Sequence, residues 1–195
     1  DDTKSNVFYW GLNQVDNIIP IRENRVKRVI YAGSLGDGYD IETIINLAEI
    51  RDDIKIIIAG SGPQASLCKE ADKRGVITYL GQVGKGELRE LYLTSDIGLL
   101  PYKKNSAVAM PIKFFDYISY DLKIVSSLNL ESSDIILQNK IGCVYESESL
   151  TSLSSSIDKV IELPYLKDKF DTLKRFYDLD RQYDNFTKKI ISLIS

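Results

Sequence analysis

Histidine is missing from this chain, and its absence removes whole classes of enzyme. None of the 195 residues is histidine, the side chain that most often serves as a general base and as a metal ligand. A Ser-His-Asp hydrolase and a His-ligated zinc enzyme are therefore excluded within this chain. The two cysteines, Cys68 and Cys143, are too few and too far apart in sequence for a zinc cluster. We interpret both as small buried or partly buried side chains, with a disulfide as the alternative.

Long apolar runs and an excess of positive charge are also missing. No stretch approaches the roughly 20 consecutive apolar residues of a membrane span, and the polar residues 1–6 lack a signal peptide's apolar core. The chain starts without methionine, so we expect an excised piece of a longer, cytoplasmic protein. Its 25 basic and 28 acidic residues give a formal charge of −3. That balance argues against a strongly basic nucleic-acid binder and permits a local anion site.

Short apolar runs alternate with helical patterns along most of the chain. The runs are rich in Ile, Val and Tyr, as buried parallel strands are, and they lie at 28–32, 54–59, 76–80, 97–100, 123–126 and 142–145. Between them apolar residues recur at helical spacing, as at Ile41, Ile44 and Ile45. Strand and helix in repeated alternation predict right-handed βαβ units and an α/β fold with a doubly wound, Rossmann-like parallel sheet.

The two ends of the chain differ from this alternating body. Residues 1–26 contain an aromatic run at 7–12, which we interpret as an N-terminal arm or an interdomain linker. Residues 27–163 form the predicted domain, and Pro164 ends a helix expected over 149–163. Residues 164–195 then carry two more helical patterns, at 166–177 and 183–194, which we expect to pack on the domain.

Three glycine-containing turns follow predicted strands. In an open parallel sheet, ligands bind outside the carboxyl ends of the strands. Gly33-Ser34 follows the first strand, Gly60 the second, and Gly81-Gln82-Val83 the third. A glycine-rich turn that leads into a helix presents backbone N–H groups to a phosphate, whereas Gly81-Gln82-Val83 could lie against a flat ligand ring. The alternative is that these are ordinary tight turns between strands and helices.

Two charged residues follow the fourth strand, on a helix predicted over 112–120 with Pro111 in its first turn. A cation at Lys113 gains nothing from the helix dipole there, which favours a role in neutralising a bound anion such as a diphosphate. Asp116 lies three residues further on, on the same helix face. Its carboxylate can accept hydrogen bonds from a diol such as ribose. The alternative is a surface ion pair between the two side chains.

The order of these motifs resembles one known family. The chain contains seven segments that match it in sequence: 31–35, 57–63, 79–83, 87–92, 95–101, 111–117 and 124–127. Together they resemble the C-terminal, donor-binding domain of family-4 retaining glycosyltransferases of the GT-B fold, over roughly residues 28–160. The resemblance implies a nucleotide-sugar donor, hexosyl transfer with retention of anomeric configuration, and no metal or other cofactor.

The resemblance also assigns roles to single residues. Asp116 occupies the place of the family's ribose-binding glutamate, whereas the preceding glutamate of that motif falls at Val108 and is absent. Ser34 and Tyr39 lie near the places of an arginine and a lysine that hold the diphosphate. Lys113 and the backbone must then hold it, and 81–83 matches the turn that contacts the base. The donor-binding residues implied are Gly33, Ser34, Gly60, Gly81, Gln82, Val83, Lys113 and Asp116.

A complete GT-B enzyme has a second, acceptor-binding domain, and this chain shows the alternation of one sheet only. The resemblance therefore implies a missing N-terminal domain, a fragment without activity of its own, and an acceptor that is a glycan or a lipid-linked sugar. It suggests bacterial surface polysaccharide synthesis at the inner face of the membrane, with peripheral contact through the full-length protein, and no nucleic-acid partner. A Rossmann-like nucleotide- or sugar-binding module without transfer activity, and a GT-B epimerase-type domain, remain as alternatives.

Overall fold

Six parallel strands lie where the sequence has its apolar runs. The structure is a computed structural model and describes residues 11–12, 20 and 26–194. The strands are β1 (Lys27–Ala32), β2 (Ile54–Ala59), β3 (Thr78–Tyr79), β4 (Ile97–Leu100), β5 (Lys123–Ser126) and β6 (Gly142–Val144). They form one sheet in the order β3-β2-β1-β4-β5-β6, and every neighbouring pair is parallel. The strand order reverses between β1 and β4, as in a doubly wound sheet, and this confirms the predicted Rossmann-like α/β fold.

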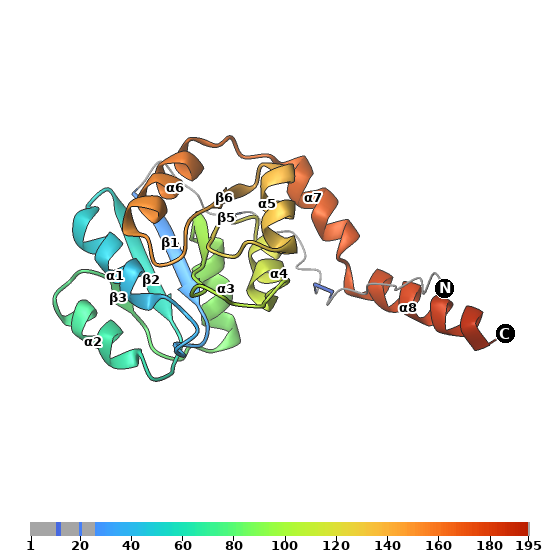
Figure 1. Cartoon of the computed structure of the whole chain (residues 1–195), viewed down its shortest axis with the longest axis horizontal. Helices are drawn as coiled ribbons and strands as arrows, with labels where there is room; N and C mark the ends of the chain where they lie inside the picture. Colours follow the sequence, from blue (N-terminus) through green and yellow to red (C-terminus); the bar gives the residue numbers. More distant parts are fainter. Residues whose placement is uncertain (1–10, 13–19, 21–25, 195) are drawn as a thin grey trace.

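Helices cover both faces of the sheet (Figure 1). One face carries α1 (Ile41–Ile50), α2 (Ala65–Lys73) and α6 (Leu150–Glu162), and the other carries α3 (Lys85–Leu93), α4 (Ile112–Ser119), α5 (Glu131–Asn139) and α7 (Lys167–Phe176). The strands supply both cores because alternate side chains point to opposite faces. In β1, Val29 and Tyr31 pack towards α1 and α6, whereas Ile30 and Ala32 pack towards α4. A buried parallel sheet needs this continuous apolar run.

The third strand is shorter than predicted. The sequence predicts residues 76–80, but only Thr78 and Tyr79 pair with β2. The reason lies at the end of α2, where the Val76 N–H donates to the carbonyl of Ala71 at 3.0 Å and so continues the helix end. Gly75, at φ +72°, makes the turn that permits this bond. Because the Val76 N–H is already bonded at the end of the helix, it cannot also donate a hydrogen bond to a strand of the sheet.

The C-terminal helices differ from each other in how they contact the domain. Phe170 and Leu173 of α7 are buried against α4. By contrast, α8 (Leu179–Ile194) extends away from the sheet beyond α7 (Figure 1). It begins four residues earlier than predicted, because the Asp178 carboxylate accepts from the Arg181 N–H at 3.0 Å and caps the helix.

A short N-terminal segment pairs with the junction of α7 and α8. The Leu12 N–H donates to the Tyr177 carbonyl at 2.8 Å, and the Leu179 N–H donates to the Leu12 carbonyl at 3.1 Å. Leu12 is buried, so this part of the predicted arm packs on the C-terminal helices. The rest of the aromatic run, residues 7–10, lies outside the described residues.

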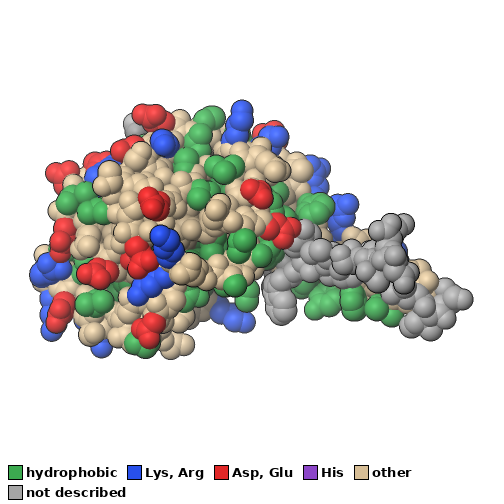
Figure 2. Space-filling view, in the orientation of Figure 1, with side chains coloured by type: hydrophobic (Ala, Val, Ile, Leu, Met, Phe, Trp, Pro, Cys, Tyr) green, Lys and Arg blue, Asp and Glu red, His purple; other side chains and the backbone are tan. Residues whose placement is uncertain are grey.

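The surface and the cysteines agree with the sequence interpretation. Acidic and basic side chains are interspersed on the face seen in Figure 2, without a basic patch. Cys68 is buried, Cys143 is half-buried, and both are free thiols. This confirms that the two cysteines are small packed side chains and do not form a disulfide.

Among the helices that the structure describes, none is long and apolar enough to cross a membrane.

Candidate functional site

Three turns lie side by side at the carboxyl ends of β1, β2 and β3. The Gly33 N–H donates to the Ala59 carbonyl at 2.8 Å, and the Gly60 N–H donates to the Gly81 carbonyl at 2.6 Å. The Tyr79 hydroxyl closes the set by donating to the Gly60 carbonyl at 2.9 Å. The three glycines predicted to bind a ligand are therefore brought together on one edge of the sheet.

Gly60 serves this arrangement through its backbone. It has a φ of +149°, a conformation that L side chains rarely adopt, and a Cβ atom there would overlap the Gly33 carbonyl oxygen. The turn after β2 can therefore approach the turn after β1 only with glycine at this position. This is a structural requirement, which agrees with the tight-turn alternative for Gly60.

Gly33 leaves room for a lysine. A Cβ atom on Gly33 would overlap Cε and Nζ of Lys113, which reaches across from the first turn of α4. The Lys113 ammonium lies 5.4 Å from the ring centroid of Tyr31 and 4.9 Å from that of Tyr39, a cation–π arrangement. No carboxylate lies within 4.0 Å of it in the part of the chain that the structure describes. The edge of the sheet thus holds an unpaired positive charge directly over Gly33.

The turn after β1 keeps several backbone donors free. Because the Gly33 N–H is bonded to Ala59, it is not available to a ligand. The N–H groups of Ser34 and of residues 36–38 donate no hydrogen bond within residues 26–194. The Gln64 side-chain amide holds this turn in place, with donated hydrogen bonds of 2.6 Å to the Gly36 carbonyl and 3.0 Å to the Tyr39 carbonyl. The turn is therefore fixed before any ligand binds.

Helix α4 adds an uncapped N-terminus to the same place. Pro111 is the N-cap residue rather than part of the first turn, and it makes no side-chain cap hydrogen bond. The N–H groups that begin a helix carry a partial positive charge when nothing caps them. The helix is held rigidly, because Tyr117 is fully buried and its hydroxyl donates to the Leu99 carbonyl at 3.0 Å. Lys113 therefore extends from a fixed, locally positive helix end.

Asp116 lies on α4 but does not pair with Lys113. The two side chains form no ion pair within 4.0 Å, so the surface ion pair considered as an alternative is absent. Asp116 lines a cavity of about 340 Å³ between α3 and α4, together with Lys85 and Arg89. Burial raises the pKa of the Asp116 carboxyl, and the charge of Lys113 opposes that shift. The carboxylate is thus partly withdrawn from water and faces a cavity with two cationic side chains on its wall.

Gln82 and Val83, the two remaining residues of the predicted site, lie just before α3. Gln82 is exposed, and Val83 is half-buried and packs against the core beneath α4. Both precede Lys85, the first residue of α3, which lines the same cavity as Asp116. The structure thus brings Gly33, Gly60 and Lys113 into contact, and it places Gln82 and Val83 next to the helix that walls the Asp116 cavity.

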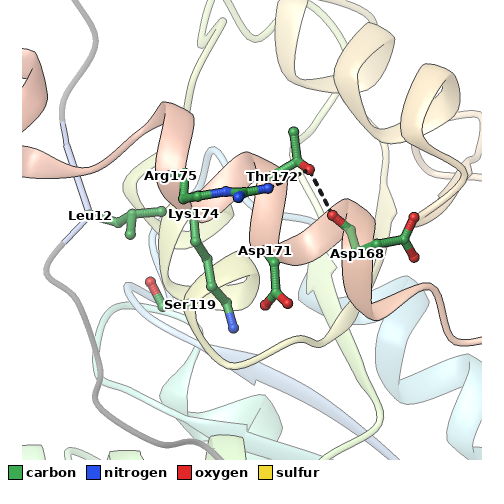
Figure 3. Close-up of a pocket in the computed structure, with 7 residues that line it drawn as sticks. All are labelled: Leu12, Ser119, Asp168, Asp171, Thr172, Lys174 and Arg175. Atoms are coloured by element: carbon green, nitrogen blue, oxygen red, sulfur yellow. Dashed lines mark hydrogen bonds between the residues drawn. The ribbon is translucent and has the colours of Figure 1, made fainter.

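A larger cavity lies next to the Asp116 cavity and shares Leu12 and Ser119 with it. It measures about 480 Å³ and lies between α7, the end of α4 and Leu12 (Figure 3). Its polar groups bond to the protein: the Thr172 hydroxyl donates to the Asp168 carbonyl at 2.8 Å, and Lys174 pairs with the buried Asp121 at 2.5 Å. Ser119, the last residue of α4, lines it, so it lies at the end of the helix opposite to Pro111.

Three residues that hold the site in place have roles that the sequence does not indicate. Tyr31 and Tyr39 support Lys113, and Gln64 fixes the first turn. Tyrosine is frequent, with 12 in the chain, but frequency does not reveal which rings meet. Tyr39 forms a β-bridge with Tyr102 on the loop after β4, and no local pattern predicts that long-range pairing.

These features define a doubly wound α/β domain with Lys113 placed over the Gly33 turn at its topological switch point. Residues 16–176 match the family model described as glycosyl transferases group 1. The chain therefore belongs to the group 1 glycosyltransferase family. No curated protein matches it.

Several solved structures share the fold at low sequence identity. One is the lipopolysaccharide outer core galactosyltransferase WaaB in its apo form, with a TM-score of 0.74 and 20% identity over 96% of this chain. Another is Anabaena HepE in complex with UDP and glucose, with a TM-score of 0.69 and 11% identity over 87% of this chain. The chain spans 55% and 49% of those two proteins. A third, the catalytic domain of a Helicobacter pylori cholesterol-alpha-glucosyltransferase, has a TM-score of 0.56 and 19% identity, with 82% of this chain and 99% of that one covered. At these identities the likeness is one of GT-B fold.

Proposed function

We propose that the chain is the donor-binding half of a family-4 retaining glycosyltransferase and binds a nucleotide-sugar. The observation that carries the proposal is the Lys113 ammonium, which lies over Gly33 on two tyrosine rings without a carboxylate partner in residues 26–194. An unpaired cation beside free N–H groups and a helix N-terminus is suited to a diphosphate. The Anabaena HepE structures, which contain UDP and glucose or UDP-glucose, support a donor of that class.

In this proposal each part of the donor has its own contacts. The diphosphate lies against Lys113 and the turn that contains Gly33 and Ser34, with Gly60 keeping the neighbouring turn close. The ribose hydroxyls donate to the Asp116 carboxylate, and the base lies against 81–83. The site needs no metal ion or other cofactor, because the lysine, the backbone N–H groups and the helix end supply the positive charge.

The wider function follows from the family. We propose transfer of a hexosyl group, with retention of configuration, to a glycan or lipid-linked acceptor held by a separate N-terminal domain. Lipopolysaccharide enzymes among the proteins of similar fold support a place in bacterial surface polysaccharide synthesis, in the cytoplasm at the inner face of the membrane. Residues 27–163 are the donor-binding domain in this proposal, with 1–26 leading from the other domain and 164–195 completing the structure. The chain alone binds donor but transfers nothing.

Calorimetry with a panel of nucleoside diphosphates tests the proposal. We expect at least one of UDP, GDP and ADP to bind, and Lys113→Gln to weaken it by about tenfold, since a charge-assisted contact contributes about 1.4 kcal/mol or more. Lys73→Gln, an exposed position on α2, is the matched control and should leave affinity unchanged. Asp116→Ala should also weaken binding while the fold persists. Absence of binding by all three nucleotides would overturn the proposal.

A further inference from the structure

A second cleft opens on the same edge of the sheet, separate from the residues assigned to the donor. It measures about 530 Å³ and is lined by three loops: 103–106 after β4, 127–130 after β5 and 144–147 after β6. None of the proposed donor-binding residues lines it. Ligands of open parallel sheets bind at this edge, and the volume is within the range of small-molecule sites.

The loops that form the cleft are fastened together at their base. The Ser127 hydroxyl donates to the Tyr102 carbonyl at 2.6 Å, and the Ser147 hydroxyl donates to the same carbonyl at 2.8 Å. The Tyr145 N–H donates to the Ser126 carbonyl at 2.9 Å. One backbone oxygen thus joins the loops after β4, β5 and β6. The cleft is formed in the free protein, so binding there carries little ordering cost.

The lining of the cleft combines apolar side chains with polar ones, and its charged groups are mostly positive. Lys103 is half-buried and Lys104 is exposed. Neither ammonium has a carboxylate within 4.0 Å among the residues described. The lining contains a single carboxylate, that of Glu146. Asn105, Ser106 and Asn129 add amide and hydroxyl groups, which suit the hydroxyls of a sugar. Two unpaired lysines among hydroxyl and amide side chains match a sugar that carries a negative charge.

The cleft is joined to the proposed donor site through the backbone. The Lys103 N–H donates to the Gly38 carbonyl at 2.9 Å, at the end of the turn that begins with Gly33. Tyr39, whose ring supports Lys113, pairs with Tyr102 in a β-bridge, and the two rings contact each other in a tilted arrangement with centroids 4.9 Å apart. A ligand in the cleft would therefore lie beside the donor rather than in its place.

From these observations we infer that the cleft binds an anionic saccharide, one that bears a phosphate group, as part of the acceptor. The inference rests on the proposed function, which makes the neighbouring site the donor site. Lys103 and Lys104 would contact the anionic group, and the hydroxyl and amide side chains would contact the sugar. The acceptor would thus contact this half of the enzyme, and the lysines of the loop after β4 would bind the acceptor's charged group.

Calorimetry with glucose 6-phosphate and with glucose, on the whole chain with and without UDP, tests the inference. We expect glucose 6-phosphate to bind more tightly than glucose and to bind equally well in the presence of UDP. The double variant Lys103→Gln/Lys104→Gln should lose about tenfold in affinity for glucose 6-phosphate, as two charge contacts of about 0.7 kcal/mol each predict. Its UDP affinity should stay within about twofold, because neither lysine is assigned to the nucleotide.

Matched variants separate the possible outcomes. Lys69→Gln/Lys73→Gln makes the same charge change at exposed positions of α2 and should leave glucose 6-phosphate binding unchanged; an equal loss would overturn the inference, since it would indicate attraction to overall charge. Displacement of glucose 6-phosphate by UDP would overturn it too, because the phosphate would then lie in the donor site. If UDP fails to bind but glucose 6-phosphate binds through the two lysines, the proposal of a donor site fails. The inference that the cleft binds an anionic saccharide then still holds.

A nucleotide-sugar donor with a charged sugar could also place an anionic saccharide in the cleft. If UDP-glucuronate binds more tightly than UDP-glucose, and the difference disappears in Lys103→Gln/Lys104→Gln, then the two lysines bind the charged sugar of the donor. That result would overturn the assignment to the acceptor. Equal binding of the two nucleotide-sugars, with glucose 6-phosphate still bound, supports it.

Discussion

Two neighbouring turns, after β1 and after β2, have similar sequences and different tasks. Gly33-Ser34 and Gly60-Ser61 each follow a buried strand that ends in alanine, and Ala32 is in register with Ala59. At Gly60 the missing side chain allows an unusual φ and a close approach to the Gly33 carbonyl. At Gly33 it leaves space for the end of the Lys113 side chain. A glycine after a strand can thus serve the fold or the site, and only its neighbours distinguish the two.

The first way to break this comparison is Gly60→Ala, which we expect to have the largest effect. The new Cβ would have to overlap a backbone oxygen that cannot move independently, at a φ of +149°. Strain of this kind costs about 1–3 kcal/mol for the backbone conformation, with more for the clash. Urea unfolding should show a loss of about 3 kcal/mol or more in the free energy of unfolding.

Gly75→Ala is the control for Gly60→Ala. Gly75 also has a positive φ, of +72°, but a Cβ there would meet nothing within 4 Å. Its cost should be limited to the backbone strain. If the two variants lose the same stability, the contact with Gly33 has no energetic importance, and the first half of the comparison fails.

The second way is Gly33→Ala, which should affect binding more than folding. The overlapping atoms belong to the flexible end of Lys113, so the lysine can move aside and the strand can keep its place. We expect the free energy of unfolding to fall by less than about 1 kcal/mol. Nucleotide affinity should fall by about tenfold, close to the effect of Lys113→Gln.

A double variant sharpens that result. If Gly33→Ala acts by displacing Lys113, then adding Lys113→Gln should cost little more, because contacting residues are not additive. Fully additive losses in calorimetric affinity would show that Gly33 acts on the nucleotide by another route. Unfolding of Gly33→Ala would make Gly33 a second structural glycine like Gly60.

The fold could be predicted from the sequence because its signals are local and repeated. Each apolar run is long enough for a buried strand. The largest difference from the prediction is in β3, where the Val76 N–H is bonded at the end of α2, and β6 ends one residue earlier than predicted. Helix α5 was not predicted, because few apolar residues mark it and Ile136 is the large side chain that it buries. Strand ends and weakly amphipathic helices depend on contacts that the local sequence does not contain.

The candidate site could be predicted in its position but not in its geometry. The switch-point rule located the edge of the sheet, and the dipole argument singled out Lys113. The same argument could not show that the Lys113 ammonium lies over the Tyr39 ring instead of pairing with Asp116, because Tyr39 belongs to a distant segment that forms a bridge with Tyr102. The free N–H groups were expected at Gly33, but that N–H is bonded to Ala59. Contacts between distant segments decide which donors stay free.

The smallest effect we predict concerns Asp116, where folding and binding have opposite requirements. Burial raises the pKa of this carboxyl, with Lys113 opposing the shift, so the ionised form is less favourable in the folded chain than in the unfolded one. Stability from this group is therefore fully present below its unfolded pKa and is lost as pH rises through the raised folded pKa.

At neutral pH, Asp116→Asn should increase the free energy of unfolding, by less than about 1 kcal/mol. The gain should shrink as pH falls and the wild-type carboxyl becomes protonated. Urea unfolding of both proteins at neutral and acidic pH measures it, and calorimetry should show weaker nucleotide binding by the more stable variant. A loss of stability at neutral pH would mean that the carboxylate stabilises the fold, and Asp116 would then resemble Gly60 rather than Gly33.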